Sequence, residues 1–216
     1  MSTKVSAKSN TDTHTVTTLE QLAALYKPPQ EAVLRKVTNH ITEPGRAFIA
    51  GAPFIIMSTA GDGGIDCSPK GDAPGFVQVA DSRTLLIPDR PGNNRLDGMK
   101  NLIANPRIGI IFIVPGIDHC YRVNGTAKIS TDPALVARFL VNDRAPRVVL
   151  VVAVEEAFSH CPKAMIRSKL WQAGAAGRPA GVPSHGQFAA FRDGGDEAYA
   201  LNYEEQYAKR IPNELY

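Results

Sequence analysis

Short apolar runs separated by turn-forming residues fill the middle of the chain, and this spacing restricts the fold more than any other feature of the sequence. The most apolar run, residues 107–114, predicts a central strand, and residues 121–129 alternate as its neighbour. Short strands at regular spacing with few helices favour a small antiparallel β-barrel. Further strands are predicted at residues 48–50, 54–59, 65–70, 76–79, 84–87 and 148–154.

Helices are predicted mainly outside this β-rich region. Residues 17–42 predict two helices, with Thr17 or Thr18 as the first cap and Pro28 and Pro29 between them. Further helices are predicted at residues 93–105, 132–140 and 196–207. The predicted organisation is a disordered tail at 1–16 and a single domain at 17–216. That domain comprises a helical N-terminal extension at 17–42, the barrel at 47–171, and a loop with a C-terminal arm at 172–216.

The composition excludes several classes of protein. The 216 residues suit one domain, and a formal net charge of +3 is too small to predict nucleic-acid binding. No apolar stretch is long enough to span a bilayer, and no secretory signal pattern is present. Cys67, Cys120 and Cys161 are too widely spaced for a disulfide framework or a zinc site, which suits a reducing compartment. We therefore expect a cytoplasmic protein that binds neither nucleic acid nor membranes.

The first stretch that could carry chemistry is residues 65–72, at the end of a predicted strand. It places the hydroxyl of Ser68 beside Pro69 and Lys70, a set that would suit a phosphate or the polar edge of a flavin. The spacing alone favours the alternative, a solvated junction between a strand and a loop.

The second stretch, residues 88–95, leads into a predicted helix. Free backbone amides at the start of that helix, together with Arg90 and Arg95, would form an anion site. An ordinary capped helix with surface arginines fits the stretch equally well. No Walker-type lysine and no G-x-G-x-x-G pattern is present, which argues against a nucleotide triphosphatase or a Rossmann dehydrogenase.

The third stretch, residues 160–171, gathers cations around the only tryptophan, Trp171. Lys163 and Arg167 are four residues apart, so a helix would put both on one face, where the indole could help to cover a planar ligand. Taken alone, an exposed basic turn with an anchored tryptophan explains this stretch better. His160 and Cys161 are adjacent in sequence, and adjacent side chains seldom face each other, so we predict no catalytic residue. The histidines show no metal-ligand spacing.

Taken in order, these stretches resemble the pyridoxamine 5'-phosphate oxidase-related family of FMN-binding split-barrel proteins, in a bacterial subgroup. The resemblance runs from about residue 19 to residue 216 and rests on five motifs, each weak alone but fairly specific in this order. The motifs are Ser-Pro-Lys-Gly-Asp at 68–72, Pro-Asp-Arg-x-Gly-Asn-Asn-Arg at 88–95, Lys-Asn-Leu with Asn-Pro-Arg at 100–107, Arg-Val-Asn-Gly-Thr-Ala at 122–127, and Cys-Pro-Lys-Ala with Arg-Ser-x-Leu-Trp at 161–171.

The resemblance implies a mainly β fold with added helices, namely a six-stranded antiparallel split β-barrel preceded by N-terminal helices. It also implies a homodimer that holds FMN in the grooves between its subunits. Matching positions imply a phosphate site made by Lys70, Arg90, Asn94 and Arg95. They further imply that the flavin ring and ribityl chain lie along Asp66, Cys67, Ser68 and Pro69, and that the site is closed, from the same or the other subunit, by Lys163, Arg167, Ser168 and Trp171.

The C-terminus departs from the family pattern. True pyridoxamine phosphate oxidases carry a C-terminal Arg-x-His substrate motif, which residues 207–216 lack. We therefore do not predict vitamin B6 oxidation for this chain. The leading hypothesis is an FMN-dependent oxidoreductase acting on a small molecule by hydride transfer at flavin N5. The alternatives are a flavin-binding protein for storage or sensing without turnover, and a split barrel that binds another cofactor, such as a deazaflavin or haem.

Overall fold

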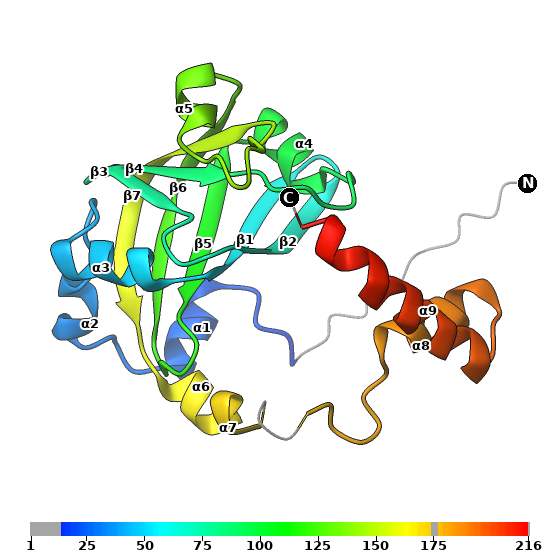
Figure 1. Ribbon diagram of the computed structural model, residues 1–216. Coiled ribbons are helices and arrows are strands. Elements are labelled where there is room, and N and C mark those ends of the chain that lie inside the picture. Colours follow the sequence, from blue (N-terminus) through cyan, green and yellow to red (C-terminus); the bar gives the residue numbers. More distant parts are fainter. Residues whose placement is uncertain (1–13, 174–176, 216) are drawn as a thin grey trace, which may run out of the picture. The chain divides into compact units, whose positions relative to one another are not determined.

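Seven antiparallel strands form the central sheet of the protein in a computed structural model that describes residues 14–173 and 177–215 (Figure 1). The strand order is β2-β1-β5-β6-β7-β4-β3, so β2 and β3 are the edges and the sheet is not closed into a ring. The predicted mainly β class with added helices is confirmed, with seven strands in place of six. The strands are β1 Phe54–Gly61, β2 Gly64–Gly71, β3 Gln78–Asp81, β4 Thr84–Pro88, β5 Arg107–Ile113, β6 Cys120–Ser130 and β7 Val149–His160.

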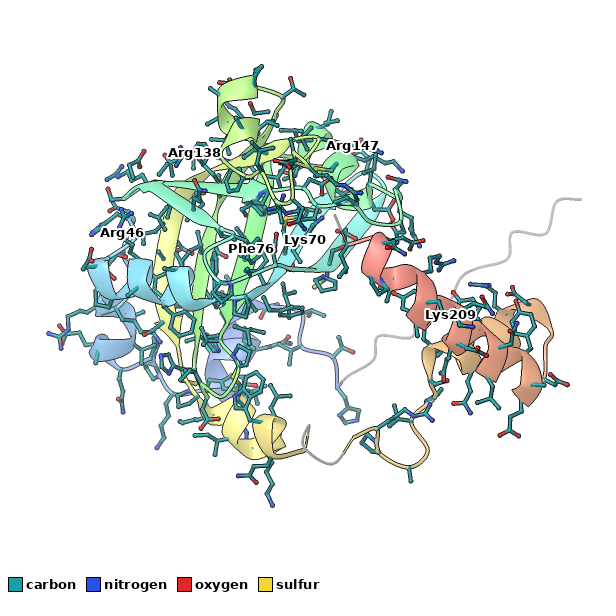
Figure 2. All side chains as sticks on the ribbon, in the orientation of Figure 1. Arg46, Lys70, Phe76, Arg138, Arg147 and Lys209 are labelled. Atoms are coloured by element: carbon teal, nitrogen blue, oxygen red, sulfur yellow. The ribbon has the colours of Figure 1, made fainter. Side chains whose placement is uncertain are left out.

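Alternating apolar residues build the core on one face of this sheet. In β1, Ile55 and Met57 are buried, and in β5 Ile110 and Phe112 lie on the same inner face, as the period of two in a strand requires. Phe76, in the segment before β3, is also buried in this core cluster (Figure 2). The core is therefore built by the alternation of inner and outer residues along these strands.

The strand predicted at residues 48–50 is wrong, because these residues belong to helix α3, Glu43–Gly51. Thr42 caps this helix by accepting a hydrogen bond from the backbone N–H of Gly45 at 3.3 Å, and a proline lies in its first turn. Ile49 is fully buried in the core. A three-residue apolar run does not distinguish a strand from the buried face of a helix, so tertiary packing decides the outcome here.

The other helices differ from their predicted bounds mainly at the ends. Helix α4 (Asp97–Ala104) begins later than predicted and α5 (Pro133–Ala137) ends earlier, whereas α9 (Glu197–Arg210) extends past the predicted end. Helix α8 was not predicted; it packs against α9 and is closed at its C-terminus by Gly194 at φ 71°. Helix α8 spans His185–Asp193. The other helices after β7 are α6 Lys163–Ser168, α7 Leu170–Ala173 and the 3₁₀-helix η2 Ile211–Asn213.

Contacts divide the chain into a unit at residues 1–36 and a unit at residues 37–216. The described part of the first unit holds the two predicted helices, α1 (Leu19–Leu25) and α2 (Glu31–Arg35), and Thr18 and Gln21 form a capping box at α1. Of the predicted disordered tail, residues 1–13 lie outside the described residues. Within the described part of the chain, none of the helices is both long enough and apolar enough to cross a membrane.

The three cysteines differ in accessibility. Cys120 is buried, and burial raises the pKa of its thiol, whereas Cys67 and Cys161 are exposed. Because the thiolate is the reactive form, we expect a thiol reagent to modify two cysteines rapidly in the native protein and the third only after unfolding. Intact-mass measurement during labelling with iodoacetamide at pH 8 checks this, and rapid triple modification of the folded protein would contradict it.

Candidate functional site

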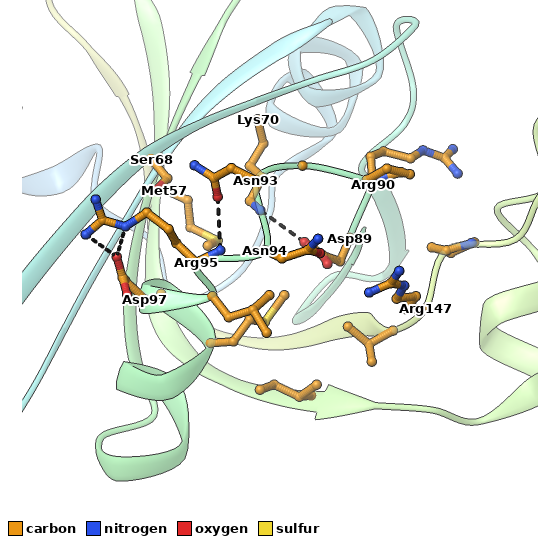
Figure 3. A pocket seen from close by; sticks show the side chains of 18 of the residues that line it. Met57, Ser68, Lys70, Asp89, Arg90, Asn93, Asn94, Arg95, Asp97 and Arg147 are labelled. Atoms are coloured by element: carbon orange, nitrogen blue, oxygen red, sulfur yellow. Dashed lines mark hydrogen bonds and ion pairs between the residues drawn. The ribbon is translucent and has the colours of Figure 1, made fainter. Parts of the chain in front are cut away.

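A cavity of about 950 Å³ lies between the inner face of β2, the segment from β4 to α4, and the segment that precedes β7 (Figure 3). Ligand cavities for cofactors and drug-sized molecules usually measure about 300–1,000 Å³. Its described lining includes Met57, Asp66, Ser68, Lys70, Asp89, Arg90, Asn93, Asn94, Arg95, Asp97, Gly98, Met99, Arg144 and Arg147.

Strand β2 divides the residues predicted from the first stretch between its two faces. Asp66, Ser68 and Lys70 line the cavity, whereas Cys67 and Pro69 alternate with them on the opposite, exposed face of this edge strand. The Ser68 hydroxyl donates to the Asp66 carboxylate, with oxygen separations of 3.0 and 2.9 Å. The structure therefore brings three of these predicted residues to the cavity and turns Cys67 and Pro69 away from it.

Helix α4 approaches β2 closely because Gly98 has no side chain. A Cβ atom at this position would lie 2.8 Å from Oδ2 of Asp66 and would displace that carboxylate. Gly98 thus sets the width of the cavity between the first turn of α4 and the inner face of β2.

The segment before α4 holds an unusual backbone conformation. Asn94 and Leu96 are both left-handed, at φ 58°, which is uncommon for asparagine and rarer for leucine. The Asn93 side chain supports the turn by accepting a hydrogen bond from the backbone N–H of Arg95 at 3.1 Å. Such strain persists where the surrounding structure enforces it, and here it brings the Asn93–Asn94 backbone to the cavity wall.

The two arginines predicted from the second stretch both line the cavity, but they differ in their hydrogen bonds and in the exposure of their side chains. The Arg90 Nε donates to Asp72 at 2.6 Å and its terminal nitrogen donates to the carbonyl oxygen of Phe139 at 2.8 Å. Only 14% of the Arg90 side chain and 3% of the Asp72 side chain are exposed. Arg90 therefore joins two segments of the fold, and its guanidinium is already engaged within the protein.

Arg95 lies at the other end of the cavity from Arg90 (Figure 3). It donates to Asp97 at 2.8 Å, and this hydrogen bond lowers the pKa of the Asp97 carboxyl. The Arg95 side chain is 76% exposed and can reorient toward a ligand. Between the two arginines, Lys70 forms an ion pair with Asp89 at 3.1 Å.

Arg144 and Arg147 also line the cavity, and the reading of the sequence missed both. Asn142 and Asp143 adopt φ of 49° and 59°, and the bridge between Val141 and Arg144 closes a hairpin turn. The Asp89 backbone N–H donates to the Val148 carbonyl at 3.0 Å, which fixes this segment beside β4. Arg147 forms no ion pair with any residue in the described part of the chain. The Asn-Asp turn was the available signal, but it gave no indication of where the arginines would lie.

The residues predicted from the third stretch do not line this cavity within one chain. Lys163, Arg167 and Ser168 lie on α6, and Trp171 lies on α7. The indole N–H of Trp171 donates to the Ile117 carbonyl at 3.0 Å, which anchors α7 to the segment after β5. The predicted helical spacing of Lys163 and Arg167 is present, yet a single chain does not bring these four residues to the cavity lining.

Comparison with known proteins identifies a protein family for the sheet-forming region. A family model described as pyridoxamine 5'-phosphate oxidase matches residues 41–161, which include every strand of the sheet. A search of curated proteins gave no match.

Several solved structures are similar to this part of the chain. HupZ from Group A Streptococcus is 22% identical, with a TM-score of 0.46, and the alignment covers 55% of this chain and 93% of HupZ. A candidate pyridoxamine 5'-phosphate oxidase from Lactobacillus delbrueckii is 21% identical, with a TM-score of 0.44 and coverage of 56% and 95%. An FAD-binding protein from Mycobacterium smegmatis is 13% identical, with a TM-score of 0.36 and coverage of 56% and 95%.

Proposed function

The chain belongs to the pyridoxamine 5'-phosphate oxidase family, and on this basis we propose that it binds FMN in the cavity beside β2 and uses it as an oxidoreductase cofactor. The observation that carries the proposal is the charge of that cavity. Lys70, Arg144 and Arg147 converge on it from two segments distant in sequence, and Arg147 forms no ion pair within the described residues. A phosphate monoester is the part of FMN that such cations would hold.

In this proposal the phosphate lies against Lys70, the Asn94 turn and Arg147. Arg95, at the mouth of the cavity, turns from Asp97 toward the same phosphate when the cofactor is bound. Arg90 no longer belongs to the phosphate site, because Asp72 and the Phe139 carbonyl already hold its guanidinium. Arg147 takes the place that the motif comparison gave to Arg90.

The other lining residues suit the remainder of the cofactor. Asp66, oriented by Ser68, offers a carboxylate that accepts hydrogen bonds from hydroxyl or N–H groups, and the half-buried Met99 with the buried Met57 supplies an apolar wall. When bound, FMN supplies hydride transfer at its N5, and the protein orients the ring and keeps water from part of it. The described lining contains no histidine, which disfavours a histidine-ligated haem as the occupant.

We also propose that the working form is a cytoplasmic homodimer. Lys163, Arg167, Ser168 and Trp171 would then close the cavity of the partner subunit, since they do not line the cavity of their own chain. In this arrangement the basic side chains of α6 would contact the FMN bound by the partner subunit. The substrate that we propose is a small organic molecule, which would bind beside the flavin.

The test is the visible absorption spectrum of the purified protein, followed by heat release and mass identification of any ligand. We expect a yellow protein that releases FMN in a ratio near one per chain and whose flavin is bleached anaerobically by NADH or NADPH. A protein that releases FMN but is not reduced by either donor would support flavin storage or sensing instead. A colourless protein that takes up no added FMN would refute the cofactor assignment.

A further inference from the structure

Two of the three cysteines lie at the adjoining ends of β6 and β7, although they are far apart in sequence. Cys120 is the first residue of β6 and pairs with His160, the last residue of β7, and Cys161 follows directly. In an antiparallel pair, such a diagonal neighbour has a Cα separation of about 6 Å. Disulfides join residues whose Cα atoms are roughly 4.4–6.8 Å apart, so the backbone permits a bond between Cys120 and Cys161.

The end of β7 frees the Cys161 side chain from the alternation of the strand. A continued strand would turn residues 120 and 161 to opposite faces, but β7 ends at His160 and the chain turns at Pro162. Burial is the main cause of the raised pKa of the Cys120 thiol, and the negative charge of the Cys161 thiolate raises this pKa further. The two thiols are therefore close enough to interact.

The two thiols differ in accessibility, as a stepwise oxidation requires. Cys161 is exposed and can meet a small oxidant from the solvent, whereas Cys120 is only 7% exposed. Arg122 lies two residues along β6 from Cys120, and its positive charge favours the Cys120 thiolate against the effect of burial. An oxidised Cys161 would therefore have beside it a second thiol that is shielded from the oxidant and can still form a thiolate.

We propose that Cys120 and Cys161 form a peroxide-reactive dithiol site that is oxidised to a reversible disulfide. The Cys161 thiolate attacks hydrogen peroxide, the O–O bond breaks, and hydroxide leaves and takes up the thiol proton as water, with a sulfenic acid remaining on Cys161. The Cys120 thiolate then attacks that sulfur, the S–O bond breaks, and a second water leaves. Two thiols are thereby oxidised to one disulfide while one peroxide is reduced to two waters. A dithiol reductant reverses the bond, so such a site can act in a reducing compartment.

Cys67 provides a comparison within the same chain. It is exposed like Cys161, and its sulfur accepts a hydrogen bond from the Ser58 hydroxyl at 3.3 Å. It lies on β2, which β1 and β5 separate from β6, so neither of the other cysteines is its neighbour in the sheet. Exposure alone is therefore common to Cys67 and Cys161, whereas a second thiol at the adjoining strand end belongs to Cys161.

The experiment treats the folded Cys67→Ser chain with a small excess of hydrogen peroxide and then counts free thiols in urea. Both remaining thiols are expected to be lost, with a mass decrease of two hydrogen atoms and a linked peptide pair that contains residues 120 and 161. Dithiothreitol should restore both thiols. With Cys120→Ser added, Cys161 should stop at the sulfenic acid, which dimedone traps. With Cys161→Ser added instead, the remaining buried thiol should react with peroxide at least about 10-fold more slowly than the Cys67→Ser chain does.

The unmodified chain is oxidised in parallel, with circular dichroism to verify that it stays folded, and its linked peptides should again join residues 120 and 161. Oxidation of Cys161 to sulfinic or sulfonic acid while Cys120 stays a free thiol would overturn the inference. Disulfides that form only between two chains, visible as a doubled mass on non-reducing gels, would overturn it as well. The bond forms without flavin, so this inference and the FMN proposal can fail independently of each other.

Discussion

Replacing Arg90 with alanine is expected to lower the free energy of unfolding by about 3–5 kcal/mol at pH 7. Arg90 donates to the Asp72 carboxylate and to the Phe139 carbonyl, and the side chains of the ion pair are only 14% and 3% exposed. The substitution removes the guanidinium from beside a carboxylate that stays buried, and this residual charge carries most of the cost. Urea unfolding of flavin-free protein, followed by circular dichroism, measures the change.

Two comparisons separate this interpretation from a general effect of losing an arginine. Arg95→Ala removes an exposed pair with Asp97, in which Arg95 is 76% exposed, so it should lower the free energy of unfolding far less than Arg90→Ala does. Arg90→Ala combined with Asp72→Ala should destabilise less than the sum of the two single changes, because no buried carboxylate remains. An Arg90→Ala loss no larger than that of Arg95→Ala would show that the buried pair contributes little.

Replacing Arg147 with alanine is expected to raise the Kd for FMN by about 10- to 100-fold, the range for losing one charge-assisted hydrogen bond. Arg147 lines the cavity and has no ion pair among the described residues, so its guanidinium is available to a phosphate. Fluorescence titration of flavin-free protein measures the affinity. Riboflavin, which has no phosphate, should bind the variant and the unmodified chain equally.

Arg138→Ala is the matched control for this change. Arg138 is exposed, lies at the end of α5 and does not line the cavity, and it is well separated from Arg147 (Figure 2). Its replacement should leave the FMN affinity unchanged. Arg95→Ala should also weaken FMN binding but not riboflavin binding, by a smaller factor than Arg147→Ala because its side chain is more exposed. Equal losses for FMN and riboflavin in Arg147→Ala would instead place Arg147 beside the ring.

The strands were predictable because each depends on a local pattern. The apolar run at residues 107–114 and the alternation at residues 121–129 matched β5 and β6 closely, since both patterns are local and burial of one face of a sheet imposes the period of two. Helix α3 was not predictable in this way, because its apolar residues form a run too short to show a period. Helix α8 begins where a stretch rich in Ala, Gly and Pro ends, at residues 173–186, and this stretch favoured a loop; the Ser184–Gln187 capping box was the available signal for the helix.

The cavity was predicted in part for the same reason. Lys70, Asn94 and Arg95 lie in turns or strand ends whose motifs are contiguous in sequence, and all three line the cavity. Arg147 reaches it through pairing of β4 with β7, a contact between segments about sixty residues apart that no local pattern encodes. Arg90 shows the converse, since it lies in a local motif and lines the cavity, but the motif gave no sign that Asp72 would engage it.

Pro69 has a consequence for how the protein behaves when crowded with copies of itself. It occupies the edge strand β2, where it pairs with Ile56 on one side while the other side of the strand has no neighbour in the sheet. Proline has no backbone N–H, so an incoming strand would find the hydrogen-bond ladder interrupted in the middle of β2. A single side chain therefore protects the longer of the two sheet edges against uncontrolled β-aggregation, and it leaves assembly to surfaces that select their partner by side-chain chemistry.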